Sequence, residues 1–181
     1  MFAIQNIYDM NQYNPVIHHR HSLRLKNYDY ASEGLYFVTI CTQHRELLFG
    51  TIDKGVLFLN DAGRMVERWY FEIEQKYPGI ACREMIVMPN HFHCIWQNLG
   101  NSNDESTKAT SLSAVVRWFK TMTTNEYIRG VEQLGWRPFN QRLWQRNYYE
   151  HIIRNELSYR TIANYIIKNP VKWKNDRFNP R

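Results

Sequence analysis

The sequence predicts an α+β fold in which helices back an antiparallel sheet. Strand-like apolar segments alternate with helical patterns along the chain. The strand-like segments 80–88 and 91–98 are separated only by Pro89-Asn90, which is typical of a hairpin and therefore of antiparallel pairing. The chain has 181 residues, 44% of them hydrophobic, which is enough for one domain with a substantial core.

Segments rich in β-branched and aromatic residues are expected to form the strands. They cover residues 35–42, 56–59, 80–88, 91–98 and 142–146. Residues 45–50 would form the exit from the first strand. The segment 142–146 differs from the others because it is basic as well as strand-like.

Apolar residues at helical spacing predict helices between these strands. The expected caps at the helix starts are Asn60 or Asp61, Ser111, and Asn155. Pro78-Gly79 would end the first helix after about Lys76, and residues 135–138 would break the second. The last helix would end before Pro170.

Polar segments divide the chain into an arm, a domain and a linker. Residues 1–30 are predicted to be a basic N-terminal arm, which is either a flexible terminus or a contact for phosphates. Residues 31–175 would form the single domain. The segment 100–110 is polar throughout and is predicted to be a mobile linker within it.

Charge and composition favour a polyanionic partner. The formal net charge is +6 and the pI is about 9.3. Aromatic residues make up 15% of the chain, which suits stacking on unpaired bases as well as an ordinary core.

Cysteine usage and hydropathy indicate a cytoplasmic protein. The cysteines Cys41, Cys82 and Cys94 form no CxxC pair, which argues against a zinc ribbon, and their odd number favours a reducing compartment. No apolar run approaches the ~20 residues that span a bilayer, and no signal sequence is recognisable. We therefore expect no membrane partner.

The motif His91-Phe92-His93 is the most informative feature for chemistry. Side chains alternate faces along a strand, so His91 and His93 would point the same way while Phe92 turns into the core. Two neutral imidazoles on one face supply half of a divalent metal site.

The last expected helix places a tyrosine beside an amide. Its apolar stripe, expected to face the sheet, consists of Tyr159, Ile162, Ala163 and Ile166. Tyr165 lies off this stripe, and Asn169 follows it by four residues, so the two would be neighbours on the helix surface. On the pattern alone a half-buried surface tyrosine is the commoner case, and a chemical role for Tyr165 is the alternative.

These motifs together resemble the REP-associated tyrosine transposases, which belong with the single-tyrosine HUH transposases of insertion sequences. The resemblance is carried by Met88-Pro89-Asn90-His91-Phe92-His93 and by Tyr165-Ile166-Ile167-Lys168-Asn169-Pro170-Val171. Segments 24–30, 34–39 and 143–154 also match, so the resemblance extends from about residue 18 to Trp173.

The resemblance implies a ferredoxin-like antiparallel sheet backed by helices, which is the HUH endonuclease fold. It implies cleavage of single-stranded DNA beside hairpins through a 5′-phosphotyrosine on Tyr165. Mg²⁺ or Mn²⁺ would be held by His91, His93 and Asn169, although the classical insertion-sequence enzymes carry glutamine at the last position. A monomer or a homodimer is expected.

Basic residues near these motifs are candidate contacts for DNA phosphates. They are Arg20, Arg24, Lys26, Arg117, Lys120, Arg142 and Arg146. Each one alone also fits an ordinary solvated charge, and the set carries more weight than its members.

Other functions stay open from the residues alone. A non-catalytic nucleic-acid-binding protein derived from a transposase would tolerate loss of Tyr165. A metal-dependent hydrolase could use His91 and His93, but it needs a third strong ligand and a general base. The sequence contains no HExxH motif and no carboxylate at ligand spacing from these histidines.

Overall fold

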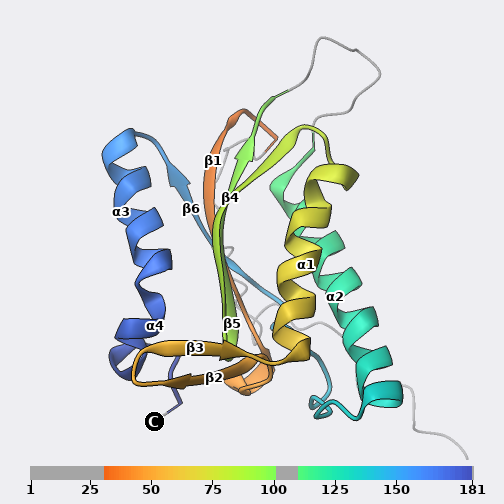
Figure 1. The fold of residues 1–181 in the computed structure, drawn as a ribbon. Helices are drawn as coiled ribbons and strands as arrows, with labels where there is room; N and C mark the ends of the chain where they lie inside the picture. The colour runs from red at the N-terminus through yellow and green to blue at the C-terminus, as the bar shows by residue number, and fades with distance from the viewer. Residues whose placement is uncertain (1–30, 101–109, 181) are drawn as a thin grey trace, which may run out of the picture.

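The computed structural model describes residues 31–100 and 110–180. It shows a sheet with α1 and α2 on one face and α3 on the other (Figure 1). The elements are β1 (Gly34–Cys41), β2 (Gly50–Asp53), β3 (Val56–Leu59), α1 (Asp61–Lys76), β4 (Ile80–Met88), β5 (His91–Asn98), α2 (Leu112–Leu134), β6 (Tyr149–Ile153), α3 (Glu156–Ile167) and α4 (Asn169–Lys172), with 3-10 turns at Gln43–Arg45 and Trp173–Asn175. The expected α+β class is confirmed.

The main sheet has the strand order β4-β5-β1-β6, and every neighbouring pair is antiparallel. The hairpin of β4 and β5 forms as expected around Pro89-Asn90. Strands β1 and β5 lie at the centre, where Thr39 pairs with His93 and Cys41 pairs with His91. The histidine motif therefore lies at one end of a central strand.

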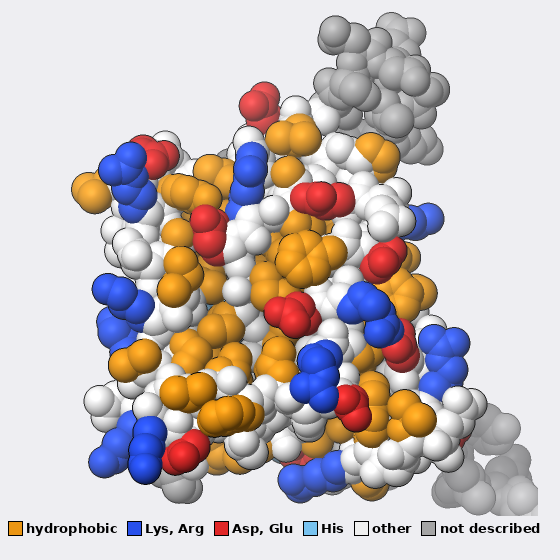
Figure 2. Space-filling view, viewed as in Figure 1, with side chains coloured by type: hydrophobic (Ala, Val, Ile, Leu, Met, Phe, Trp, Pro, Cys, Tyr) orange, Lys and Arg blue, Asp and Glu red, His pale blue; other side chains and the backbone are white. Residues whose placement is uncertain are grey.

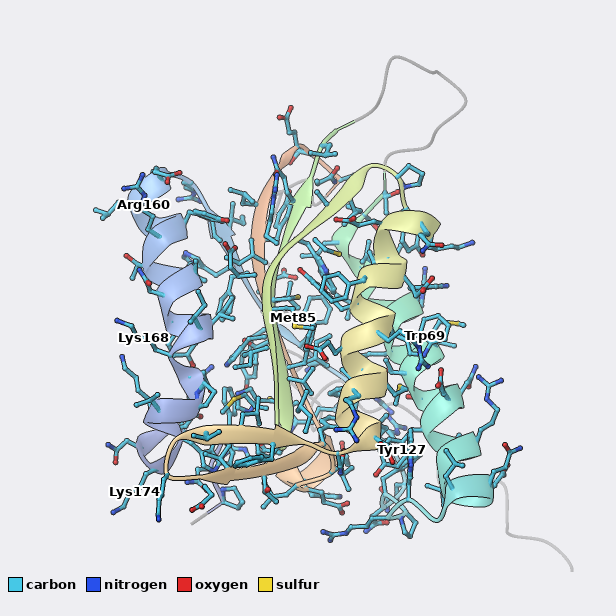
Figure 3. All side chains as sticks on the ribbon, in the orientation of Figure 1. Trp69, Met85, Tyr127, Arg160, Lys168 and Lys174 are labelled. Atoms are coloured by element: carbon cyan, nitrogen blue, oxygen red, sulfur yellow. The ribbon has the colours of Figure 1, made fainter. Side chains whose placement is uncertain are left out.

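Side chains of β5 alternate between two hydrophobic cores. Phe92 and Trp96 are fully buried in the larger core, between the sheet and the α1–α2 layer. Ile95 points the other way and packs with Ala163 and Ile166 of α3. Tyr159 and Ile162 border this smaller core, which confirms the predicted apolar stripe. Arg160 and Lys168 point outward from the same segment (Figure 3).

The predicted helix caps are confirmed by hydrogen bonds. The side chain of Asn60 accepts from the backbone N–H of Gly63 at 2.9 Å, and Asn155 accepts from Ser158 at 2.8 Å. Ser111 accepts from the backbone of Ala114 at 3.3 Å.

One expected strand is wrong. Residues 142–146 form only an isolated bridge, between Trp144 and Thr42, and the sheet is completed instead by β6. The ammonium of Lys120 donates to the carbonyls of residues 145–147, at 2.9, 3.4 and 3.2 Å. Leu143 and Trp144 are both buried, so consecutive side chains enter the core and the alternation of a strand is lost.

A short strand was not expected from the sequence. Strand β2 begins at Gly50, the last residue of the segment expected as an exit from β1, and it pairs with β3. The turn between them is Lys54-Gly55, and both residues have positive φ, 48° and 80°. Such a turn closes a two-residue hairpin, and the Lys-Gly pair is a weak form of its sequence signal.

No described helix is both long enough and apolar enough to span a membrane.

Candidate active site on the HxH strand

His91 and His93 lie side by side on the face of β5 that points toward α3. Their ring centroids are 4.5 Å apart, and both side chains are almost fully buried. The face is the one expected from strand alternation, since Phe92 between them enters the opposite core. The structure thus brings both imidazoles to one point.

A buried amide fixes the tautomer of His91. Asn90 Nδ2 donates to the carbonyl oxygens of Arg45 at 3.1 Å and Phe178 at 2.7 Å. Its Oδ1 must then accept from His91 Nδ1, 2.8 Å away. The proton of His91 is therefore assigned to Nδ1, and Nε2 carries a free lone pair. This buried Nε2 has no hydrogen-bond partner.

His93 connects a threonine to the expected nucleophile. Its Nδ1 lies 2.7 Å from Thr39 Oγ1, and its Nε2 lies 3.4 Å from the hydroxyl of Tyr165. The rings of His93 and Tyr165 are 5.3 Å apart between centroids. The hydroxyl of Tyr165 therefore points at the imidazole pair from α3.

Asn169 joins this cluster from the start of α4. It is fully buried, and its Nδ2 donates to Asp176 Oδ2 at 3.4 Å, which leaves Oδ1 free to face other groups. That Oδ1 has no hydrogen-bond donor. The amide of Asn169 lies close enough to shift the pKa of both His91 and Tyr165. Asn169 is thus near both groups with an unused oxygen.

Burial sets the protonation states of the cluster. It lowers the pKa of His91 to about 3, an effect reinforced by the positive charge of Arg177. Burial also lowers the pKa of His93, with His91 acting in the same direction. Burial raises the pKa of Tyr165, and the charge of Asp176 adds to this. At neutral pH the imidazoles are therefore neutral and the phenol keeps its proton.

The donor set fits a divalent cation. Two imidazole nitrogens and an amide oxygen form a mixed N/O set, in which imidazole is the commonest metal ligand of proteins and the amide oxygen suits Mg²⁺ or Mn²⁺. Such an ion would satisfy two buried acceptors that have no hydrogen-bond donor, His91 Nε2 and Asn169 Oδ1. Within residues 31–100 and 110–180, no three His, Cys, Asp or Glu side chains cluster at metal-ligand spacing. A carboxylate-rich hydrolase site is therefore not found among them.

The C-terminal segment 176–178 covers the site, which sequence reasoning missed. The ring of Phe178 is buried and lies 4.7 Å from His91 between centroids. The carbonyl of Phe178 accepts from Asn90, and the carbonyl of Arg177 accepts from Arg45 at 2.8 Å. These residues follow the last recognisable motif, and no pattern in the sequence marks them. In this conformation the imidazoles are closed off from solvent.

Two other tyrosines lie near the site. Tyr149 pairs with Thr39, so it lies on the same face of the sheet as the two imidazoles. Its side chain is 43% exposed, and its ring centroid lies 6.4 Å from that of Phe178. Tyr148 lies under Lys120, whose ammonium is 5.6 Å from its ring. Tyr148 also packs against the larger core, on the face of the sheet opposite the imidazoles.

The predicted DNA-binding residues fall into separate groups. Lys120, Arg142 and Arg146 line one groove between α2 and residues 139–146, whereas Arg117 is exposed on α2 outside that groove. Arg20, Arg24 and Lys26, like the arm and most of the linker, lie outside the described residues. On the face seen in Figure 2, Lys and Arg are interspersed with Asp and Glu and form no continuous basic track. The phosphate-binding roles stay predictions.

Comparisons with known proteins agree with this arrangement. The family model described as "Transposase IS200 like" matches residues 36–169. An uncharacterised protein of Haemophilus influenzae is 38% identical, over 92% of this chain and 96% of its own. A REP-associated tyrosine transposase of Escherichia coli is 31% identical, over 79% of this chain and 70% of its own.

A solved structure has a similar fold. It is a REP-associated tyrosine transposase bound to a REP hairpin, with a TM-score of 0.54 and 24% identity. The match covers 82% of this chain and 73% of the other. This likeness agrees with the four-stranded antiparallel sheet backed by helices.

Proposed function

Because the chain belongs to the IS200-like transposase family, we propose that it cuts and rejoins single-stranded DNA with Tyr165 as the nucleophile. The observation that carries the proposal is the hydroxyl of Tyr165, 3.4 Å from His93 Nε2 and beside Asn169. A hydroxyl beside a candidate cation site is the arrangement that phosphoryl transfer to a side chain requires.

In the proposed step, Tyr165 Oη forms a bond to phosphorus while the bond from phosphorus to the 3′ oxygen breaks. The products are a 5′-phosphotyrosine and a free 3′-hydroxyl. The proton lost by the phenol is balanced by the proton that the 3′ oxygen takes up. A DNA 3′-hydroxyl can reverse the step and join strands without another energy source, since one phosphate ester replaces another.

The residues around Tyr165 prepare this step in different ways. Burial raises the pKa of Tyr165, so the phenol is protonated at neutral pH and has to lose its proton during the attack on phosphorus. His91, His93 and Asn169 would hold Mg²⁺ or Mn²⁺, and burial keeps both imidazoles neutral for that purpose. When bound, the ion would polarise the scissile phosphate and screen its charge.

Hairpin DNA is the partner that we propose. The related transposase structure contains a REP hairpin, and the net charge of this chain, +6, suits a polyanion. Because Phe178 covers the imidazoles, we expect the segment 176–178 to move before a phosphate can approach His91 and His93. A monomer or a homodimer remains the expectation.

The test is a covalent adduct assay. The protein is incubated with Mn²⁺ or Mg²⁺ and single-stranded hairpin DNA from the flanks of its gene, and adducts are separated on a denaturing gel. Tyr165→Phe should lose the adduct but keep hairpin binding, and it should lose only about 1 kcal/mol of stability, the net value of one hydrogen bond.

Tyr159→Phe is the matched control. Tyr159 lies on the same helix, and its hydroxyl donates to Glu84 at 2.8 Å instead of facing the imidazoles. This variant should still form the adduct. An adduct on Tyr165→Phe would show that the nucleophile is another residue. Hairpin binding by the wild type without any adduct would favour the non-catalytic binding protein.

A further inference from the structure

Thr39 is a buried polar side chain in the middle of an apolar strand. Val38 and Ile40, which flank it on β1, are buried in the larger core, so Thr39 points to the opposite face, toward α3. Only 1% of the residue is exposed. A hydroxyl that is buried this completely is expected to have a hydrogen-bond partner, because it has lost its contacts with water.

The partner of this hydroxyl is His93. The two residues are directly opposite each other across β1 and β5, so their side chains share one face of the sheet. Thr39 Oγ1 lies 2.7 Å from His93 Nδ1, and this hydrogen bond is buried. Thr39 thus contacts the ring nitrogen that does not face Tyr165.

Two neighbours fix the orientation of this imidazole. The ring of Phe37 stacks on that of His93, with centroids 5.3 Å apart and an interplanar angle of 29°, which restrains the tilt of the ring. Rotation of the imidazole by half a turn would preserve this stacking but would exchange the two edges of the ring. The hydrogen bond to Thr39 selects one edge, and it leaves Nε2 directed at the hydroxyl of Tyr165, 3.4 Å away.

The two imidazoles are therefore held by different kinds of side chain. Asn90 Oδ1, 2.8 Å from His91 Nδ1, can only accept a hydrogen bond and so keeps His91 in one tautomer. A hydroxyl can accept or donate, so Thr39 can keep its hydrogen bond to His93 in either tautomer. A cation bound to Nε2 requires the proton of the neutral imidazole to be on Nδ1, where Thr39 can accept it.

We propose that Thr39 is the positioning residue that presents His93 Nε2 to the divalent cation. The proposal rests on the cation site proposed above. A bound cation withdraws electron density from the ring, so Nδ1–H becomes a stronger donor and its hydrogen bond to Thr39 is worth more than in the metal-free protein. Partners that orient a metal-ligating histidine in this way typically change metal affinity by about 10–100-fold. Strand formation alone does not need the hydroxyl, since valine has the same branched shape and also favours strands.

The test is a Mn²⁺ titration of variants at position 39, with the free ion measured by electron paramagnetic resonance. Thr39→Val removes the hydroxyl but keeps the branched shape, and we expect it to bind Mn²⁺ about tenfold more weakly than the wild type. Thr39→Ala also lacks the hydroxyl, without placing a methyl group beside Nδ1, and should show a similar loss. Thr39→Ser keeps the hydroxyl and should bind Mn²⁺ with nearly the affinity of the wild type.

Thr123→Val is the matched control for the loss of a buried hydroxyl. Thr123 is fully buried on α2, and its Oγ1 accepts from Trp144 Nε1 at 2.9 Å. Helix α2 lies on the face of the sheet opposite α3, so this hydrogen bond is away from the imidazoles (Figure 1). The variant should have a lower thermal stability, like Thr39→Val, but an unchanged affinity for Mn²⁺.

The coordination of bound Mn²⁺ gives a readout that a purely structural role of Thr39 would not change. Electron spin-echo envelope modulation with isotope-labelled histidine detects the imidazole nitrogens that are coupled to the ion. The wild type and Thr39→Ser, both saturated with Mn²⁺, should show coupling to both imidazoles. Thr39→Val should show a modulation depth close to that of a single coupled imidazole, because His93 Nε2 is no longer held toward the ion.

Several results would overturn the proposal. They are an unchanged Mn²⁺ affinity in both Thr39→Val and Thr39→Ala, or a reduced affinity while coupling to both imidazoles is retained. An equal loss of affinity in Thr123→Val would also overturn it, because the effect would then follow from stability. A wild type that does not bind Mn²⁺, or binds it without coupling to histidine, would reject the cation site itself. Coupling in the wild type with unchanged affinity in the variants would reject only the role of Thr39.

Discussion

Asn90→Ala should weaken metal binding, although Asn90 is not itself one of the proposed metal ligands. Asn90 Oδ1 orients His91 through its Nδ1, 2.8 Å away, and the amide nitrogen is fixed by the carbonyls of Arg45 and Phe178. Loss of such a supporting hydrogen bond typically costs about 10–100-fold in metal affinity. The substitution also leaves the buried carbonyl of Phe178 and the partly buried carbonyl of Arg45 without this donor, so we expect stability to fall by about 2–3 kcal/mol.

The assay is a Mn²⁺ titration followed by the electron paramagnetic resonance signal of the free ion. Asn98→Ala is the matched control, because Asn98 is a buried asparagine at the other end of β5. It loses contacts to Ala31, Thr110 and Gly100, at 3.1, 3.2 and 3.0 Å, and should lose similar stability. Its Mn²⁺ affinity should be unchanged. Equal affinities for both variants and the wild type would refute the reasoning.

Three further predictions concern protonation, access and the arm. In the metal-free protein, burial lowers the pKa of His91 from 6.5 to about 3, so between these values the folded state binds fewer protons than the unfolded state. Stability should therefore fall as the pH drops, by about 1.4 kcal/mol between pH 7.5 and 5.5 from His91 alone. Urea unfolding of His91→Gln at both pH values should show a smaller loss, and an equal loss would assign the effect to other groups. Phe178→Ala should form the adduct faster than the wild type in a time course, because the ring covers both imidazoles. Phe178→Leu should form it at a rate close to that of the wild type. Equal rates in all three proteins would mean that the ring does not limit access. Deletion of residues 1–26 should lower the affinity for DNA and make that affinity less dependent on salt. The rate at which bound DNA is cut should change less than the affinity does. Unchanged affinity would mean that the arm does not contact DNA.

The part of the site that follows from local periodicity could be predicted from the sequence. Alternation along a strand places His91 and His93 on one face whatever the rest of the fold does. The apolar stripe of α3 similarly determines which side of that helix meets the sheet. The relation of Tyr165 to Asn169 is also local, since the chain stays nearly helical across Lys168, where φ is −88° and ψ is 3°.

The parts that depend on distant contacts could not be predicted. The composition of residues 142–146 is that of a strand, but hydrogen bonds from Lys120 and the burial of Trp144 hold the segment in another conformation. The positions of Asp176 and Phe178 depend on hydrogen bonds with Asn169 and Asn90, and no pattern in the sequence links the members of these pairs. Tertiary contacts of this kind override local propensity and leave no periodic signal.

The central claim is that Tyr165 forms the bond to DNA, and peptide mapping of the adduct tests it most directly. Trypsin cleavage after Arg146, Arg154, Arg160 and Lys168 places the candidate tyrosines on separate peptides. Tyr148 and Tyr149 fall in residues 147–154, Tyr159 in 155–160 and Tyr165 in 161–168. Mass spectrometry of nuclease-trimmed adduct should find the 5′-phosphonucleotide on the peptide 161–168. The same mass on 147–154 or 155–160 would contradict the account.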